Sequence, residues 1–297
     1  MKRTLTYTIS QDKNKMPIDD YLKSMGYSSR LLIALKKMPE SILVNGVWEY
    51  VTTLLYTGDI LTIQLEETTS SPNIEPVALP LTIVYEDEDI LVVNKPANMS
   101  IHPSQNHYLN TLANAVSYYY NSQNIPYTFR CINRLDRDTT GLTILAKHMI
   151  SACILSGMVQ SHTIRREYTA IVAGTFSKAD GCIDAPIGRV ADSTIERMVD
   201  YEHGESAKTY YHVEQESIVD GIQISLVSLW LATGRTHQIR VHMKYIGHPI
   251  LGDFLYHEDM RLITRQALHS YRLTFPHPIT GKEMEFIAPL PPDMRLL

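Results

Sequence analysis

Short apolar and β-branched runs recur along most of the chain, and turn-forming residues separate them. These runs predict strands over 82–86, 90–94, 142–146, 167–173, 208–214, 222–232 and 267–275. Between the strands expected over 90–94 and 142–146, apolar residues recur at helical spacing, namely Leu109, Leu112, Ala113 and Val116. Helices are expected over 109–121, 148–160 and 236–246. The mixture predicts an α+β fold, in which peripheral helices accompany a mixed, largely antiparallel sheet.

The first 66 residues have a pattern of their own. Residues 18–22 resemble a helix start with an acidic first turn, and residues 28–37 resemble a second helix that begins at a serine cap. A strand over 42–47 leads into an Asn-Gly turn, and 58–63 is expected to be another strand. Two short helices followed by small strands predict a compact α/β module.

A stretch rich in Ser, Thr and Pro follows this module. It covers 67–80, has few apolar residues and is typical of a linker. We therefore expect a small module over 1–66, a linker over 67–80 and a larger domain over 81–297.

Composition favours a globular protein of the cytoplasm. Hydrophobic residues make up 44% of the chain and charged residues 20%. Cys131, Cys153 and Cys182 show no metal-ligand spacing, and a sparse, odd cysteine count suits a reducing compartment. The first residues lead into no signal-like apolar region, and no apolar run approaches the roughly 20 residues of a membrane span. We expect a cytoplasmic monomer without a membrane partner.

The net charge of −5 argues against a protein held to nucleic acid by bulk charge. Local basic patches are still possible, because several arginines and lysines cluster around the motifs described next. An averaged mixed surface is the alternative interpretation.

The densest chemistry lies at 133–142, where Asp136 stands between Arg134 and Arg137 in a turn-rich loop. Nearby cations favour the ionised form of a carboxylate. A fixed carboxylate can act as a nucleophile, and it can equally be half of a structural Arg–Asp pair. The local sequence leaves both interpretations open.

This loop resembles a known catalytic motif. It has the form Arg-Leu-Asp-x-x-Thr-Thr-Gly-Leu and ends in Ala146-Lys147, as in RluA-type RNA pseudouridine synthases. Three further blocks agree with that family in order and spacing, so the resemblance spans roughly residues 80–290. They are 83–96 closed by His102-Pro103, 166–170, and 233–242 followed by 247–253 and Tyr256. Asn133 and Asn98 depart from the commonest family pattern, which has His and Gly there. Asn98 tolerates left-handed backbone better than most residues.

The resemblance implies an isomerase that breaks the glycosidic bond of a uridine, rotates the base and rejoins it at C5. Asp136 matches the family's nucleophile, which attacks either C6 of uracil or C1′ of ribose. Arg240 matches its charge partner, with Arg235 as the alternative. Tyr168, 32 residues after Asp136, matches the tyrosine that packs on the target base and assists proton removal at C5. Without the resemblance, a surface arginine and a core tyrosine would be the plainer interpretations.

Other residues are expected to contact the substrate. Leu142 and Ile144 are predicted to line an apolar wall of the site, and Arg134 to contact RNA or to support the loop. The remaining candidates for RNA contact or for structural hydrogen bonds are Lys95, His102, Arg235 and His237. Residues 1–66 resemble the alpha-L RNA-binding module of a small-subunit ribosomal protein, in which Arg30, Lys36 and Lys37 would supply positive charge. A docking role without RNA contact is the alternative for this module.

The reaction needs no cofactor, and the sequence contains no phosphate loop and no Cys-x-x-Cys motif. A metal site is not expected, because His237 and His242 are five residues apart with no acidic residue between them. The resemblance favours large-subunit ribosomal RNA as substrate, with tRNA second. Two rivals belong to other classes. They are a catalytically silent RNA-binding assembly factor and a metal-dependent nucleic-acid hydrolase that uses Asp136 and Asp138.

Overall fold

The computed structural model describes residues 1–105 and 107–296, and the chain forms two compact units. The first unit contains 1–92, 102–132 and 144–161, and the second contains 93–101, 133–143 and 162–297. Because the chain passes between the units several times, each unit is built from distant segments. The predicted division into 1–66, 67–80 and 81–297 follows the order of the sequence instead and stays a prediction.

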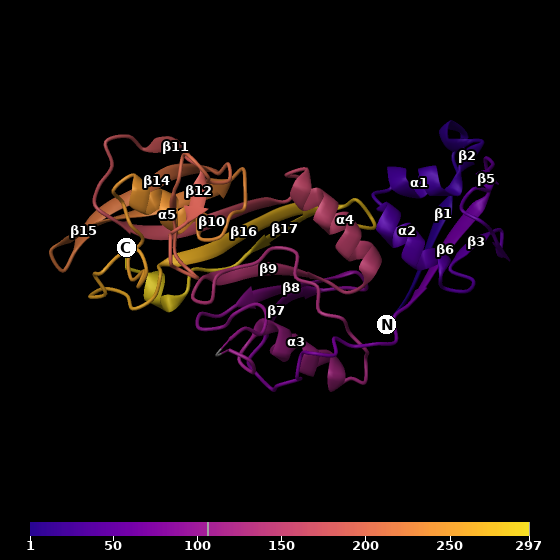
Figure 1. Cartoon of the computed structure of the whole chain (residues 1–297), viewed down its shortest axis with the longest axis horizontal. Coiled ribbons are helices and arrows are strands. Elements are labelled where there is room, and N and C mark those ends of the chain that lie inside the picture. The colour runs from indigo at the N-terminus through magenta and orange to yellow at the C-terminus, as the bar shows by residue number, and fades with distance from the viewer. Residues whose placement is uncertain (106, 297) are drawn as a thin grey trace. The chain divides into compact units, whose positions relative to one another are not determined.

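The N-terminal elements of the first unit all fall within 1–66 (Figure 1). They are β1 (Lys2–Thr8), η1 (Gln11–Lys13), β2 (Met16–Pro17), α1 (Ile18–Ser24), α2 (Ser29–Lys36), β3 (Ile42–Val44), β4 (Val47–Trp48), β5 (Leu54–Leu55) and β6 (Ile60–Glu66). One sheet has the order β1-β6-β3-β4, and β2 pairs with β5. The side chain of Ser28 caps α2 by accepting from the N–H of Leu31. Asn45 and Gly46 both have positive φ, as the predicted Asn-Gly hairpin turn requires.

The strand β1 was not predicted, although it pairs with β6 along its whole length. Residues 67–80 contain no helix or strand. They are nevertheless tied to the rest of the first unit, because the hydroxyls of Ser70 and Ser71 accept from the N–H groups of Tyr127 and Phe129.

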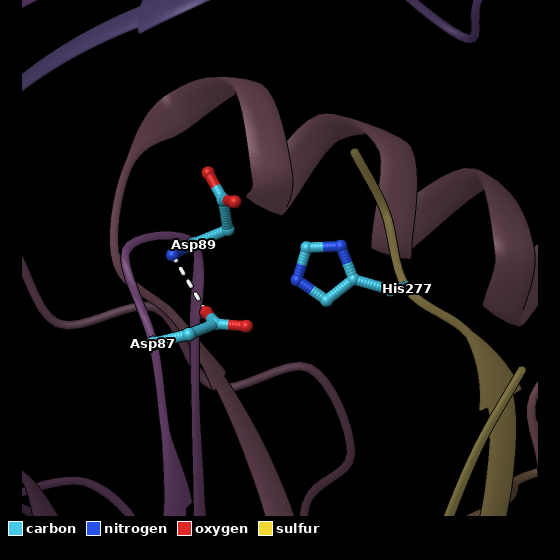
Figure 2. Close-up of side chains that lie close together, drawn as sticks. All are labelled: Asp87, Asp89 and His277. Atoms are coloured by element: carbon cyan, nitrogen blue, oxygen red, sulfur yellow. Dashed lines mark hydrogen bonds between the residues drawn. The ribbon is translucent and has the colours of Figure 1, made fainter. Parts of the chain in front are cut away.

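The remaining elements of the first unit include β7 (Thr82–Glu86), α3 (Leu112–Asn121) and α4 (Met149–Gln160). The β7 strand ends in an acidic turn, where Asp87 accepts from the N–H groups of Asp89 and Ile90 (Figure 2). His277, also drawn there, belongs to the second unit, where it accepts from the N–H groups of its own turn. The α3 helix begins three residues later than predicted, because Thr111 caps it in a capping box with Asn114.

Two strands have residues in both units, β8 (Ile90–Lys95) and β9 (Thr140–Ala146). The other elements of the second unit are β10 (Arg165–Ala173), β11 (Asp180–Asp184), β12 (Ile187–Arg189), β13 (Arg197–Val199), β14 (Lys208–Val219), β15 (Ile222–Leu231), α5 (Gln238–Tyr245), β16 (Leu268–Pro276), β17 (Glu283–Ile287) and η2 (Pro292–Met294). The predicted strands and helices of 81–297 are present with small shifts of their ends. The strands β11, β12, β13 and β17 were not predicted.

The sheet of the second unit runs in the order β11-β14-β15-β10-β16-β9, and β17 pairs with β16 (Figure 1). Five of its strand pairs are antiparallel, β10–β15, β10–β16, β11–β14, β14–β15 and β16–β17, whereas β16 and β9 pair in parallel. After β9, the strand order continues with β8 and then β7. The predicted α+β class with a mixed, largely antiparallel sheet is therefore confirmed.

The core of the second unit lies against the central strands β10 and β15 and the helix α5. Ile171 and Val227 are fully buried in it, together with Met243 of α5. The α5 helix also packs against β13 and β14. This packing fixes the helix that carries Arg240. Within the described residues, no helix has both the length and the apolar character needed to cross a membrane.

Candidate active site

Asp136 lies in a loop that enters β9, and internal hydrogen bonds hold this loop in shape. The amide of Asn133 donates to the carbonyl of Leu142 at 3.1 Å, and its own backbone carbonyl accepts from the hydroxyl of Thr143 at 2.6 Å. The N–H of Thr139 closes a turn on the carbonyl of Asp136 at 3.2 Å. Bonds between the loop and its own strand therefore hold the backbone around Asp136 in shape.

A close backbone approach pins the far end of this loop. Gly141 has a φ of +109°, and a Cβ at this position would meet the carbonyl oxygen of Ser270 at 2.3 Å. Only glycine fits there, because both the dihedral angle and the contact exclude a side chain. The Thr-Thr-Gly part of the motif therefore has a structural role in seating β9 beside β16.

Lys95 supports the loop from within the protein. Its side chain is 1% exposed, and the ammonium donates to the carbonyls of Pro96, Met99 and Arg137 at 2.8–2.9 Å. Since an ammonium has three donors, these bonds engage all of them. Asn98, in the turn that Lys95 holds, has a φ of +54°, the left-handed conformation that this residue type was expected to tolerate.

The structure brings Asp136 and Arg240 together. Arg240 lies on α5, is 3% exposed and donates from Nη1 to Oδ2 of Asp136 at 2.9 Å. Its Nε and Nη2 donate to the two carboxylate oxygens of Asp253, each at 2.7 Å. This fork-to-fork pair fixes the plane of the guanidinium and hence the direction of Nη1.

Asp136 is the accessible member of this network, since its side chain is 28% exposed while that of Asp253 is fully buried. Arg240 holds Oδ2 of Asp136. Within residues 1–105 and 107–296, no group of the protein donates a hydrogen bond to Oδ1 of Asp136. One anchored oxygen and one open oxygen suit a carboxylate that attacks a bound substrate.

Two opposing effects act on Arg240. Burial alone would lower its pKa, but the hydrogen bonds with Asp253 and the charge of Asp136 outweigh burial, so the pKa of Arg240 is raised. The guanidinium therefore stays positive at any working pH. It also lies 4.9 Å from the ring centroid of Tyr256, which adds a cation–π contact.

The α5 helix begins at Gln238, two residues later than predicted, because His237 takes a left-handed conformation with φ 57°. The helix predicted over 236–246 is therefore wrong for Thr236 and His237, which precede α5. The Gln238 side chain stabilises this start by accepting from the N–H of Arg235 and donating to the carbonyl of Lys208.

His237 lies beside Asp136, with its Nε2 3.9 Å from Oδ2. Its Nδ1 is 2.9 Å from the hydroxyl of Tyr256, and that hydroxyl also accepts from the backbone N–H of Arg197. The buried Tyr256 hydroxyl is fully satisfied when it donates to Nδ1, which places the ring proton of a neutral His237 on Nε2. Burial lowers the pKa of His237 against the opposing charge of Asp136, so the neutral ring prevails at neutral pH.

Tyr168 lies on β10 in the core of the second unit and is 4% exposed. Burial raises its pKa, the neighbouring Arg166 opposes this effect and the charge of Asp136 adds to it. The phenol therefore keeps its proton at neutral pH. The influence of Asp136 places Tyr168 in the electrostatic surroundings of the carboxylate.

The other predicted residues occupy different environments. Arg134 is exposed, whereas Leu142 is fully buried in the second unit and Ile144 is fully buried in the first. Arg235, the alternative partner for Asp136, pairs instead with Glu205 at 2.5 Å.

The remaining candidates make other contacts or are exposed. In the first unit, His102 packs edge-on against Phe129, with ring centroids 5.0 Å apart. His242 uses both ring nitrogens, on the hydroxyl of Thr209 and the carbonyl of Ala185. The three basic residues of the N-terminal module, Arg30, Lys36 and Lys37, are all exposed on α2 or at its end.

Three residues of this region received no role from the sequence. Asp253 and Tyr256 were quoted only as parts of a motif, and Phe254 was not singled out. The sequence does place Asp253 in a short run that also contains Phe254 and Tyr256. Nothing local shows, however, which arginine Asp253 would meet 13 residues away.

Comparisons with known proteins agree with this geometry. The family described as RNA pseudouridylate synthase matches residues 89–245. The chain is 40% identical over 282 residues to "Uncharacterized RNA pseudouridine synthase YjbO" of Bacillus subtilis (strain 168), covering 95% of this chain and 98% of that protein. It is also 40% identical over 269 residues to "Ribosomal large subunit pseudouridine synthase D" of Vibrio cholerae serotype O1, covering 85% and 81%.

Among solved structures, "Human RNA Pseudouridylate Synthase Domain Containing 1" is similar, with a TM-score of 0.61 and 28% identity. The match covers 73% of this chain and 86% of that one. Asp136, Tyr168 and Arg240 all lie within the matched family segment. The chain belongs to the RNA pseudouridine synthases, isomerases of the RluA type that convert uridine in RNA to pseudouridine.

Proposed function

We propose that this enzyme isomerises uridines in large-subunit ribosomal RNA and that Asp136 is its nucleophile. The observation that carries the nucleophile is the asymmetry of the Asp136 carboxylate. Arg240 holds one oxygen at 2.9 Å, while the side chain remains partly accessible. A nucleophile must be both oriented and reachable, and this carboxylate has both properties.

The other residues take supporting roles in this proposal. Arg240 orients Asp136 and balances its charge, and Asp253 keeps Arg240 in place. Tyr168 offers its ring to the target base, and its raised pKa makes the hydroxyl a hydrogen-bond donor in the free enzyme. Asp136 attacks C1′ or C6 of the uridine, the N1–C1′ bond breaks and the uracil rotates. A bond then forms between C1′ and C5, the bond to Asp136 breaks, C5 loses its proton and N1 takes one up, so the product is an isomer of the substrate.

The choice of RNA rests on the relatives. A protein 40% identical to this chain is named for the large ribosomal subunit, and it aligns with 85% of the chain. We accordingly favour large-subunit ribosomal RNA over tRNA. A cytoplasmic location and a monomeric state complete the proposal. The exposed Arg30, Lys36 and Lys37 are positioned to add phosphate contacts.

Conversion of defined transcripts tests this proposal. Purified full-length protein is incubated with unmodified large-subunit ribosomal RNA and, separately, with unmodified tRNAs, and pseudouridine is mapped at nucleotide resolution. We expect conversion at one or a few uridines of the ribosomal RNA. Conversion confined to tRNA would overturn the choice of RNA and leave the chemistry intact.

The nucleophile is tested with Asp136→Asn, which keeps the shape of the side chain and removes its charge. We expect conversion to disappear while RNA affinity stays within a few-fold of the wild type. Asp220→Asn is the matched control, because Asp220 is an exposed turn residue of the same unit with a positive φ that Asn also tolerates. Substantial conversion by Asp136→Asn would show that another group is the nucleophile.

A further inference from the structure

A cavity of about 420 Å³ opens beside the loop that carries Asp136. Phe254, Arg137, Asn98 and Arg265 are among its lining residues. All of them belong to the second unit, as does the Arg240 network. The volume lies within the usual range of small-ligand sites, roughly 300–1,000 Å³.

Phe254 is the unusual member of this lining. Its ring is 53% exposed, although a phenylalanine is among the residues most often buried. The guanidinium of Arg137 lies 5.7 Å from the ring centroid, and that of Arg240 lies 6.0 Å from it. One aromatic ring is therefore shared between the cavity and the arginine that holds Asp136.

The backbone that carries Phe254 is held firmly. The preceding Asp253 binds Arg240 through both oxygens, and its Oδ1 also accepts from the N–H of Leu255. The Asp253 carbonyl accepts from the N–H groups of Tyr256 and His257. An exposed ring on a fixed backbone is a preorganised stacking surface, which binds with little loss of conformational entropy.

The two arginines that line the cavity differ in how far their guanidinium groups are engaged by the protein. Arg265 is engaged by Asp293 and by backbone carbonyls. Arg137 donates to Asp138 from Nε and Nη2 only, and its side chain is 39% exposed. Within residues 1–105 and 107–296, the third nitrogen, Nη1, makes no hydrogen bond, and it belongs to a partly exposed side chain beside the aromatic ring.

An aromatic face beside a free guanidinium nitrogen matches the chemistry of an unpaired nucleotide. The base has a π-face that stacks on any aromatic ring, and the ribose and phosphate supply acceptors for the guanidinium. We propose that this cavity binds the base of a nucleotide adjacent to the reacting uridine, stacked on Phe254, with Arg137 on its ribose or phosphate. The inference rests on the proposed function, because it takes the RNA strand at Asp136 as its starting point.

The adjacency follows from the shared arginine. Arg240 touches Asp136 with Nη1 and approaches the Phe254 ring with its Cζ, so a base on that ring neighbours a uridine at Asp136. A base held there must be unstacked from its helix. The subsite would therefore favour target uridines in loops over those in continuous duplexes.

The first test measures binding and needs no turnover. Affinity for a nine-nucleotide oligouridylate is measured with the full-length wild type and with Phe254→Ala, Phe254→Leu and Phe254→Trp. Loss of one stacked base weakens binding by about tenfold, so Ala and Leu should both show that loss and Trp should not. Tyr210→Ala is the matched control, an exposed aromatic residue of the same unit that does not line the cavity.

Equal affinities of the wild type and Phe254→Ala would overturn the subsite, whatever the enzyme converts. Equal weakening by Phe254→Ala and Tyr210→Ala would also overturn it, because binding would then depend on aromatic surface in general. Rescue by Leu as well as by Trp would indicate an apolar side chain of a protein partner as the occupant and would again overturn it.

The second test locates the base. RNA fragments around a converted uridine are prepared with an abasic residue on its 5′ side or on its 3′ side. For one of the two positions, the abasic residue should weaken the wild type about tenfold and should leave Phe254→Ala unchanged. Independent losses at both positions would refute the contact. If the wild type converts no uridine at all, the proposed function fails, while the oligouridylate result still decides the subsite.

Discussion

At the scale of single residues, the reactive carboxylate depends on a second carboxylate that never meets the substrate. Asp253 is fully buried and accepts hydrogen bonds from Nε and Nη2 of Arg240. The third position, Nη1, is thereby directed at Asp136. Asp253 is therefore a positioning residue, and its effect should be on turnover more than on RNA binding.

Asp253→Asn tests this role. The amide keeps the size of the side chain but offers one acceptor instead of two, so the guanidinium plane is released and Asp136 is misplaced. We expect kcat to fall by about 100-fold, as small misplacements of catalytic groups commonly cause, while KM changes little. The measurement is steady-state conversion of the mapped RNA, at a temperature where thermal melting shows both proteins folded.

Asp259→Asn is the matched control for this variant. Asp259 also pairs with an arginine, Arg261, but that arginine is exposed and the pair lies outside the Arg240 network. Its substitution should change kcat less than twofold. A wild-type kcat for Asp253→Asn would show that Arg240 is held without Asp253.

At the scale of elements, the parallel contact between β9 and β16 decides where the catalytic loop is placed. His269 of β16 joins the two strands, with Nδ1 2.7 Å from the hydroxyl of Thr140 and Nε2 donating to the carbonyl of Ala288 at 3.2 Å. Burial lowers the pKa of His269 from 6.5 to about 4, against the effect of the Ala288 hydrogen bond. This strand contact therefore depends on a neutral histidine.

The pKa of His269 predicts how folding stability depends on pH. The folded-state pKa lies below the unfolded value, so the unfolded chain binds more protons between pH 6.5 and about 4. The histidine's contribution is then complete above pH 6.5 and is lost as the pH falls through this window, by up to about 3 kcal/mol. Urea unfolding of the wild type and of His269→Gln at pH 7 and pH 4.5 measures the difference.

We expect His269→Gln to be less stable at pH 7 and to lose less stability on acidification. His212→Gln is the control. The hydrogen bond with Asp180 raises the pKa of His212, so this histidine stabilises the fold more at low pH, opposite to His269. An unchanged pH dependence in His269→Gln would assign the acid sensitivity to other groups.

At the scale of the whole chain, the N-terminal strand is bound within the first unit by a buried ion pair. Arg3 of β1 donates from Nε and Nη2 to the two oxygens of Asp89, at 2.8 and 3.0 Å. Asp89 also lies 2.8 Å from Nε2 of His148, the residue that caps α4. Residues 1–66 are thus tied to segments far along the chain.

Arg3→Leu should destabilise the protein, because it removes both hydrogen bonds that the guanidinium donates to the nearly buried Asp89 carboxylate. Removing one partner of a fully buried pair costs about 3–5 kcal/mol, and because Arg3 is only partly buried the cost here should fall below that range. Lys2→Leu is the control on the same strand, since its pair with Glu66 is exposed and should contribute no more than about 1 kcal/mol. Denaturant unfolding of both variants and of Arg3→Leu/Asp89→Asn measures these costs.

Partial recovery of stability in Arg3→Leu/Asp89→Asn is expected, because the double variant no longer buries a carboxylate that has lost its arginine. Equal stabilities of Arg3→Leu and Lys2→Leu would show that the buried pair does not hold the module.

Much of the fold could be predicted from local patterns. The helix over 148–160 and the strands that include 167–173 and 222–232 were expected within a few residues, because burial on one side repeats every two or every 3.6 residues. The strands β11 and β17 were missed, because each has only five residues, which is short for a period to be recognised.

The sequence by itself determined the fold class, the family and the loop that holds Asp136, because each is encoded in neighbouring residues. It also singled out Arg240 together with Arg235. Only the tertiary structure decided between these arginines, since 104 residues separate Arg240 from Asp136 while their atoms are 2.9 Å apart. The structure likewise turned Lys95 inward and set Phe254 beside Arg240. Such pairings depend on burial and on distance in space, which follow from packing of the whole unit and leave no local signal in the chain.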